Sequence, residues 1–329
     1  TLFAGFTEYM PGRNRGTWSS RVSFIGNWSY PLCSLIAMGL TPLISAEWNW
    51  RVQLLIPAIL SLIATALAWR YFPESPRWLE SRGRYQEAEK VMRSIEEGVI
   101  RQTGKPLPPV VIADDGKAPQ AVPYSALLTG VLLKRVILGS CVLIAMNVVQ
   151  YTLINWLPTI FMTQGINLKD SIVLNTMSMF GAPFGIFIAM LVMDKIPRKT
   201  MGVGLLILIA VLGYIYSMQT SMLLITLIGF FLITFVYMYV CYASAVYVPE
   251  IWPTEAKLRG SGLANAVGRI SGIAAPYAVA VLLSSYGVTG VFILLGAVSI
   301  VVAIAIATIG IETKGVSVES LSIDAVANK

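Results

Sequence analysis

The sequence predicts an all-α integral membrane protein, and three observations carry that prediction. Of the 329 residues, 56% are hydrophobic and only 12% are charged, about half the charged share of an average soluble domain. Apolar runs of roughly 20 residues, long enough to cross a bilayer as helices, recur along the chain. The basic residues gather in alternate connections between these runs, which is the pattern that orients membrane proteins.

Eight apolar runs are long enough to span, and the first ten residues resemble the end of a ninth. The expected spans are 22–44, 52–72, 136–161, 171–193, 201–218, 222–248, 261–284 and 289–311. None alternates with a period of two residues, so a membrane barrel is excluded. The chain has three cysteines and no histidine, so we expect no metal site and no cofactor.

The basic residues set the orientation. The connection from Arg70 to Arg135 carries eleven of them, whereas the connections on the opposite side carry only Arg51 and Lys169. Connections rich in lysine and arginine stay inside the cell. We therefore expect a multi-pass protein of the inner (plasma) membrane, monomeric, with both ends of this chain in the cytoplasm.

The long central connection is predicted to hold one amphipathic helix. Ala88, Val91, Met92 and Ile95 share one face at helical spacing, and the opposite face is charged. This helix either packs under the bundle or binds a partner or the membrane surface.

Two short motifs recur at nearly the same offset. Glu8–Gly16 has the pattern E-x-x-P-x-x-x-R-G, and Glu250–Gly260 has the same pattern with two more residues between proline and arginine. Glu74 and Glu312, each just after a span, are 238 residues apart, against 242 for Glu8 and Glu250. These pairs suggest duplicated halves of six spans each, as in many transporters.

The repeat predicts how the chain is organised. Only two spans and a stub precede the first closing motif, so roughly 100–130 residues of the first half are expected to be missing before this chain starts. The expected divisions are 1–72, the remnant of the N-terminal half (the end of its fourth helix and its fifth and sixth helices); 73–134, a cytoplasmic loop; 135–311, the C-terminal half; and 312–329, a cytoplasmic tail.

These motifs resemble those of the major facilitator superfamily. The matching segments are EYMPGRNRG, PESPRWLESRGR, DKIPRK and PEIWPTEAKLRG. In DKIPRK, Pro197 stands where the family usually has glycine. PESPRWLESRGRYQEAEKV, ETKG and the arginine in ANAVGRI are similar to the organic-ion, nicotinate and aromatic-acid carriers, although sugar porters share the PESPR and ETKG signatures. The resemblance implies a major facilitator-type helical bundle, N-terminally truncated, with eight full transmembrane helices and a stub of a ninth.

Arg269 is the strongest candidate for substrate binding. It is the only charged residue deep within a full predicted span, about 13 Å from Gly260. A buried cation needs a partner, and no predicted span supplies a carboxylate. The partner is either an anionic substrate, which a guanidinium binds well, or an acid outside this chain. Asn265 lies one turn earlier on the same face.

Polar residues on other spans are weaker candidates. Asn147, Gln150, Tyr151 and Asn155 form a stripe that either contacts substrate or bonds helix to helix. Tyr239 and Tyr242 either stack on a ring-shaped substrate or pack between helices. Asn27 belongs to a further polar face on the first full span.

The charged residues at the cytoplasmic helix ends are expected to form a gate or a structural network. They are Glu8, Arg15, Asp194, Arg198, Glu250 and Arg259. In the family resembled here, the equivalent residues hold the two halves closed on the inside. We expect Glu250 to lie within reach of the basic residues at 194–199 or of Arg259.

Taken together, the residues predict a secondary transporter and not an enzyme. The spans hold no histidine, aspartate or glutamate for catalysis, and no nucleotide-binding loop is present. We expect a proton-coupled symporter that carries a small organic anion, such as an aromatic or nicotinate-like monocarboxylate. The proton-binding acid would lie outside this chain. The alternative is a carrier of sugar or of another neutral or cationic metabolite.

Overall fold

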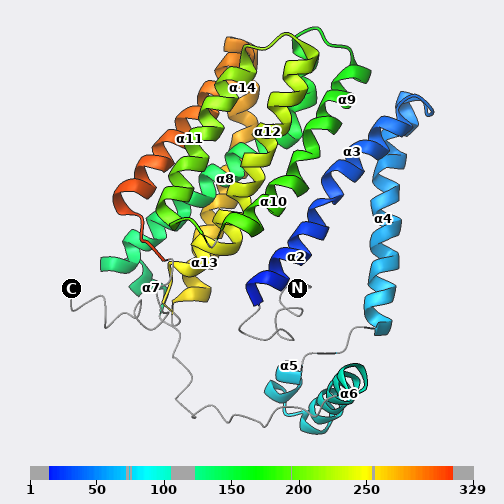
Figure 1. The fold of residues 1–329 in the computed structure, drawn as a ribbon, viewed down its shortest axis with the longest axis vertical. Helices are drawn as coiled ribbons and strands as arrows, with labels where there is room; N and C mark the ends of the chain where they lie inside the picture. The colour runs from blue at the N-terminus through cyan, green and yellow to red at the C-terminus, as the bar shows by residue number, and fades with distance from the viewer. Residues whose placement is uncertain are drawn as a thin grey trace. The chain divides into compact units, whose positions relative to one another are not determined.

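The computed structural model describes residues 15–71, 74, 76–104, 123–193, 195–253 and 256–313, and every regular element in these ranges is helical (Figure 1). Contacts divide the chain into two units, one holding 20–43 with 119–329 and the other holding 1–19 with 44–118. Six helices of the described residues are long and apolar enough to span a membrane.

The second of these units holds a long apolar helix followed by two polar ones. The apolar helix is α4 (Ala46–Tyr71), and α5 (Pro76–Ser81) packs against α6 (Tyr85–Thr103). Helix α6 is the predicted amphipathic helix: Ala88 on its apolar face is buried, and Gly104 ends it in the left-handed conformation that terminates many helices.

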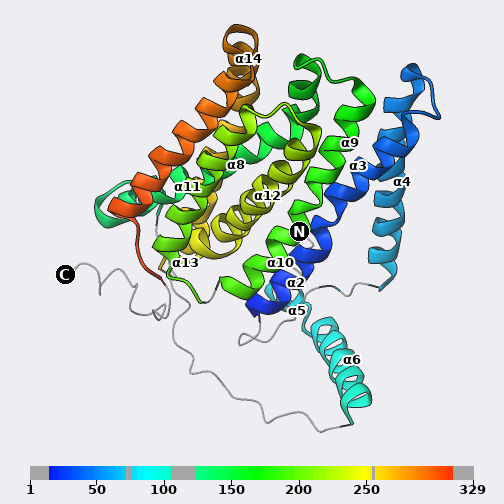
Figure 2. The same ribbon diagram turned by 45° about the horizontal axis from the view of Figure 1, so that its top comes forward.

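The larger unit begins at Ser20 within α2 (Arg15–Asn27) and continues with α3 (Ser29–Leu40). The sequence predicts one continuous span here, but the helix is interrupted at Trp28, so that two helices form. The span predicted at 171–193 is likewise divided at Phe180 into α9 (Leu168–Met179) and α10 (Gly181–Val192). Helix α3 runs beside α9 in both ribbon views (Figures 1 and 2).

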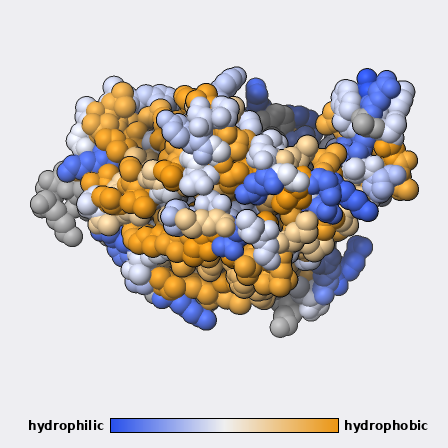
Figure 3. Space-filling model, turned by 90° about the horizontal axis from the view of Figure 1, so that it is seen from above, coloured by the Kyte–Doolittle hydropathy of each residue, from blue (hydrophilic) through white to orange (hydrophobic). Residues whose placement is uncertain are grey.

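The remaining helices form the core of this unit. They are α7 (Tyr124–Leu127), α8 (Gly130–Thr163), α11 (Arg198–Ser217), α12 (Met222–Val240), a π-helical segment (Cys241–Tyr247), α13 (Val248–Glu250) and α14 (Lys257–Ile309). Helix α8 packs extensively on α14, and α11 also lies along α14. Apolar side chains remain exposed on the outside of these helices, and Figure 3 shows them over much of the visible surface, as expected of a protein whose surroundings are lipid.

Helix α14 contains both of the last two predicted spans. One residue inside it, Gly287, has non-helical backbone angles, with φ 63° and ψ −161°, and the chain kinks there. Only glycine adopts this conformation without strain. The turn that the sequence predicts between 284 and 289 is therefore real, but it is reduced to a single residue.

Replacing Gly287 with alanine should destabilise the protein by about 1–3 kcal/mol, the cost of forcing a side chain into a glycine-only backbone region. Nothing lies within 4 Å of an added Cβ at this position, so the effect isolates the backbone. Gly204, in the helical interior of α11 and equally open, is the matched control. Its alanine variant should be neutral or stabilised by up to about 1 kcal/mol. Denaturant titration of both variants in detergent tests this, and equal effects would contradict it.

Candidate functional site

Two polar clusters stand out in the larger unit, one within the helices and one at the helix ends that the sequence predicts to be cytoplasmic. The inner cluster forms where α8 meets the first half of α14. Gly268 and Gly272 form a G-x-x-x-G pair, and a Cβ at Gly268 would lie 2.8 Å from the Cβ of Leu143. A Cβ at Gly272 would lie 3.0 Å from the ring of Tyr151. The two helices approach this closely because neither glycine has a side chain.

Arg269 lies between these glycines in sequence and meets Tyr151 across the helix pair. Its Nη1 donates a hydrogen bond to the Tyr151 hydroxyl oxygen. Arg269 is exposed, and no carboxylate contacts it among the residues that the structure describes. The structure therefore brings two of the predicted site residues together, and the guanidinium keeps most of its donors available.

The other predicted residues of the polar stripe take different positions. Asn147 is buried, donates to the Leu143 carbonyl oxygen at 2.7 Å and lies against Gly268, so it contributes to the contact between α8 and α14. Asn155, one turn beyond Tyr151, is exposed. Asn265 is also exposed and donates to the Ser261 carbonyl oxygen at 2.9 Å. Asn147 and Tyr151 thus lie at the contact between α8 and α14.

Gln150 belongs to a neighbouring aromatic cluster that sequence analysis missed. The Tyr30 and Tyr237 rings meet edge to face with centroids 5.1 Å apart, and the buried Tyr237 hydroxyl lies close to Tyr30 and to the Gln150 amide. This cluster joins α3, α8 and α12. The sequence offered one signal, the polar face that continues from Asn27 to Tyr30 along the first predicted span.

Asn27 lies apart from these clusters in its contacts. Its Nδ2 donates to the Ser23 carbonyl oxygen at 2.7 Å, one turn earlier in α2, and the residue is half-buried. Its role in substrate binding stays a prediction.

Tyr239 and Tyr242 pack between helices, which was the alternative to stacking on a substrate. Both are fully buried, with 1% and 0% exposed. The Tyr239 hydroxyl donates to the Val142 carbonyl oxygen at 3.1 Å, and the Tyr242 ring stacks on Tyr247 with centroids 5.0 Å apart. They fill the contact between α12, its π-helical extension and α8, so they do not share a surface with Arg269.

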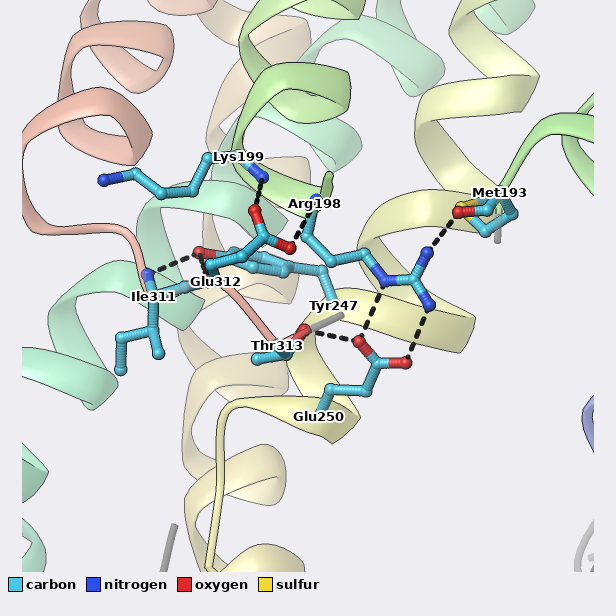
Figure 4. A network of polar contacts seen from close by, with 8 residues as sticks. All are labelled: Met193, Arg198, Lys199, Tyr247, Glu250, Ile311, Glu312 and Thr313. Carbon is cyan, nitrogen blue, oxygen red and sulfur yellow. Dashed lines mark hydrogen bonds and ion pairs between the residues drawn. The ribbon is translucent and has the colours of Figure 1, made fainter. Parts of the chain in front are cut away.

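The second cluster, which we call the cytoplasmic network after its predicted side of the membrane, is centred on Arg198 at the start of α11 (Figure 4). Its guanidinium forms a two-pronged pair with Glu250, with Nε to Oε2 at 3.0 Å and Nη2 to Oε1 at 3.2 Å, and Nη1 donates to the Met193 carbonyl oxygen. The Thr313 hydroxyl donates to the same carboxylate. The expected contact of Glu250 with the 194–199 segment is confirmed.

The segment after α14 closes this network. The Glu312 carboxylate accepts the backbone N–H groups of Arg198 at 2.7 Å and Lys199 at 3.1 Å (Figure 4). The Tyr247 hydroxyl donates to the Ile311 carbonyl oxygen at 3.1 Å and accepts the Ile311 N–H at 3.0 Å. Because Pro197 before the helix has no side-chain acceptor, Glu312 supplies the negative charge that the start of α11 favours.

The remaining predicted gate residues are only partly described. Glu8 and Asp194 lie outside the described residues, and of Arg15 only its place at the start of α2 is described. The Arg259 guanidinium stacks over the Tyr124 ring, 5.1 Å from its centroid. Arg259 therefore takes part in holding α7 against the start of α14.

Apolar helices of spanning length, with a polar contact between α8 and α14 and a charged network at the helix ends, are typical of a membrane transporter. Residues 2–276 match the Major Facilitator Superfamily, and the chain belongs to that family. It is thus a multi-pass membrane protein that transports metabolites, and not an enzyme.

Individual relatives agree with this assignment. YdjK of Escherichia coli (strain K12) is 99% identical over 329 residues, which cover all of this chain and 72% of that protein. The inner membrane metabolite transport protein YdjE of the same strain is 44% identical, covering 97% of this chain and 70% of that protein. The niacin transporter NiaP of Acinetobacter baylyi (strain ATCC 33305 / BD413 / ADP1) is 24% identical, covering 96% and 70%.

The fold also matches a solved structure. The xylose transporter XylE from E. coli, in a partially occluded inward open conformation, superposes with a TM-score of 0.71 at 18% identity, covering 96% of this chain and 68% of that chain. The helical bundle predicted from the sequence is confirmed. These relatives are longer than this chain.

Glu250→Gln should lower the free energy of unfolding by about 1–3 kcal/mol, because it weakens hydrogen bonds to a charged group. An exposed pair would contribute only about 0–1 kcal/mol, but the Arg198 side chain is only 7% exposed and Glu250 35%. The matched control is Glu89→Gln on α6, whose pair with Arg93 is 72% and 70% exposed and should change stability by less than about 1 kcal/mol. Equal losses in the two variants, measured by denaturant titration, would contradict this account of the network.

Proposed function

We propose that the full-length protein transports a small organic anion, an aromatic or nicotinate-like monocarboxylate, by alternating access. The observation that supports this most is Arg269, a guanidinium within the transmembrane part of α14 whose described partner is a neutral hydroxyl. A cation at membrane depth is costly unless a negative charge or water compensates it. A carboxylate substrate supplies that charge and fits the two-pronged geometry of a guanidinium.

Neighbouring groups suit the rest of such a substrate. Asn155 on α8 and Asn265 on α14 are exposed amides within one turn of Tyr151 and Arg269, and they offer neutral hydrogen bonds to a ring nitrogen or hydroxyl. Tyr30 and Gln150 are half-buried and extend the polar surface toward α3. In this proposal they replace Tyr239 and Tyr242 as the aromatic and polar contacts.

The relatives support both the proposed substrate and its alternative. NiaP is a niacin transporter, which favours a ring-bearing carboxylate, whereas XylE transports xylose, which keeps a sugar as the alternative substrate. A sugar has hydroxyl groups that amides and tyrosines can bind, but it carries no charge to neutralise Arg269. Arg269 therefore favours the anion.

The proposal includes the arrangement of the transporter in the cell. YdjE is an inner membrane protein, so we place this transporter there as well, with both ends of the chain in the cytoplasm. The segments 1–72 and 135–311 belong to two six-helix halves joined by 73–134. The cytoplasmic network, together with Glu8, Arg15 and Asp194, gates the inner side. The transporter is a monomer and a proton symporter whose proton-binding acid lies in a segment outside this chain.

Arg269→Lys and Arg269→Gln test the substrate class in the full-length protein. Lysine keeps the charge but loses the two-pronged geometry, so uptake should fall about tenfold. Glutamine loses both the charge and the geometry, and uptake should fall at least about 100-fold, because each hydrogen bond between charged groups contributes about 1.5–3 kcal/mol. The measurement is uptake of radiolabelled nicotinate and benzoate into proteoliposomes at equal protein content.

The test needs a control variant, and two outcomes would argue against the anion. Arg93→Gln, on the exposed face of α6, is the control and should leave uptake unchanged. If sugars compete for uptake while nicotinate-like and benzoate-like acids do not, the sugar alternative replaces the anion. Unchanged uptake in Arg269→Gln would remove Arg269 from the substrate site.

Tyr151→Phe tests whether the hydroxyl holds the guanidinium in its binding position. The ring and its contact with Gly272 are retained, so the helix pair should stay intact. We expect KM for the anion to rise about three- to tenfold, since a typical hydrogen bond contributes about 1 kcal/mol, with little change in maximal rate. Tyr214→Phe, on the exposed face of α11, should leave both values unchanged. A fall in maximal rate alone would argue against this role.

A further inference from the structure

A cavity of about 300 Å³ lies between the end of α3 and the start of α9, away from both clusters described above. Met38, Thr41 and Pro42 form one wall, and Leu168, Lys169, Ile172 and Val173 form the other. The Thr41 hydroxyl is already hydrogen-bonded to the Ala37 carbonyl oxygen at 2.7 Å. The remaining wall is apolar except for Lys169, the one charged side chain at the cavity.

The depth of this cavity follows from the helix ends. Thr41 caps α3 and Lys169 lies in the first turn of α9, so the cavity opens at the level where spanning helices leave the hydrocarbon. The distribution of basic residues puts this end on the non-cytoplasmic side. A lysine at such a depth extends its apolar stem along the membrane and its ammonium toward the headgroups.

The ammonium group of Lys169 has no ion-pair partner among the described residues. Its neighbour Asp170 is held by the helix-capping Asn167, whose amide donates to the Asp170 carboxylate at 2.8 Å and whose oxygen accepts the Asp170 N–H at 2.9 Å. No ion pair joins Lys169 to another described residue. Arg51, the other basic residue assigned to this side, is instead stacked on Trp50, 4.5 Å from the ring centroid.

We propose that this cavity binds an acyl chain of an anionic phospholipid whose phosphate pairs with Lys169. The apolar wall takes the hydrocarbon, and the cation at its rim takes the negative charge, which is the charge complementarity that lipid sites between transmembrane helices use. Such a lipid lies in the contact between α3 and α9, where the Thr176 hydroxyl also donates to the Ser34 carbonyl oxygen at 3.3 Å. The bound lipid therefore stabilises that helix contact. The inference depends only on the membrane location, and not on the proposed substrate.

The test uses the full-length protein in nanodiscs and phospholipids with a diazirine on the acyl chain. Phosphatidylglycerol is compared with phosphatidylcholine carrying the same chain, and labelled peptides are mapped by mass spectrometry. We expect phosphatidylglycerol to label 38–42 and 168–173 about fivefold more than phosphatidylcholine does. This is the preference for an anionic lipid that one lysine near the membrane surface is expected to give. Lys169→Gln should abolish the preference while labelling by phosphatidylcholine persists.

A second pair of variants tests the cavity itself. Ile172→Trp fills it and should reduce labelling of both segments by either lipid. Leu208→Trp adds the same side chain to an exposed position on α11 and should leave the labelling unchanged. Equal labelling by the two lipids in the unsubstituted protein would overturn the proposal. Labelling that neither Lys169→Gln nor Ile172→Trp alters would also overturn it. The same holds if neither segment is labelled because other parts of the full-length protein cover the cavity.

Discussion

The close approach of α8 to α14 is the constraint on which the inner cluster depends. At Gly268 and Gly272 an added Cβ would lie only 2.8 Å and 3.0 Å from atoms of α8, and the Tyr151 ring lies against Gly272. In a bilayer, helices gain little from burying apolar surface, since lipid is equally apolar. Close packing and interhelical hydrogen bonds must hold them together instead. The same contact that holds this helix pair also places a hydroxyl within reach of Arg269.

The cytoplasmic network applies a related principle to charged groups. Arg198 is nearly buried, and it is tolerated because carboxylate and carbonyl oxygens accept several of its hydrogen bonds. The network connects α10, α11, α13 and the segment after α14, which are distant in sequence. A change in the position of one of these elements must therefore alter the hydrogen bonds of the others. Such mutual dependence is what a gate between two conformations requires.

Much of the fold could be predicted because hydrophobic length and charge placement are properties of the sequence alone. The membrane class, the amphipathic helix at Ala88 and the two spans within α14 follow from such patterns. The breaks at Trp28 and Phe180 were missed, because the proline near each break stands three residues beyond it. Periodicity grouped Asn147 and Tyr151 on one helix face, but it could not say which helix lies opposite, and it could not decide between stacking and packing for Tyr239 and Tyr242. That choice depends on which helix lies opposite, and the neighbouring helix is distant in sequence.

The hydrogen bonds from Arg198 and Lys199 to Glu312 also bear on how the protein is made. Helix α11 is synthesised more than a hundred residues before the carboxylate that caps its first turn. During translation its first N–H groups must be satisfied by water or headgroups at the membrane surface. The cap can form only after the last helix has inserted and its trailing segment has emerged from the ribosome. Formation of this cap is therefore a late step in assembly, and it marks a C-terminal bundle whose last span is in place.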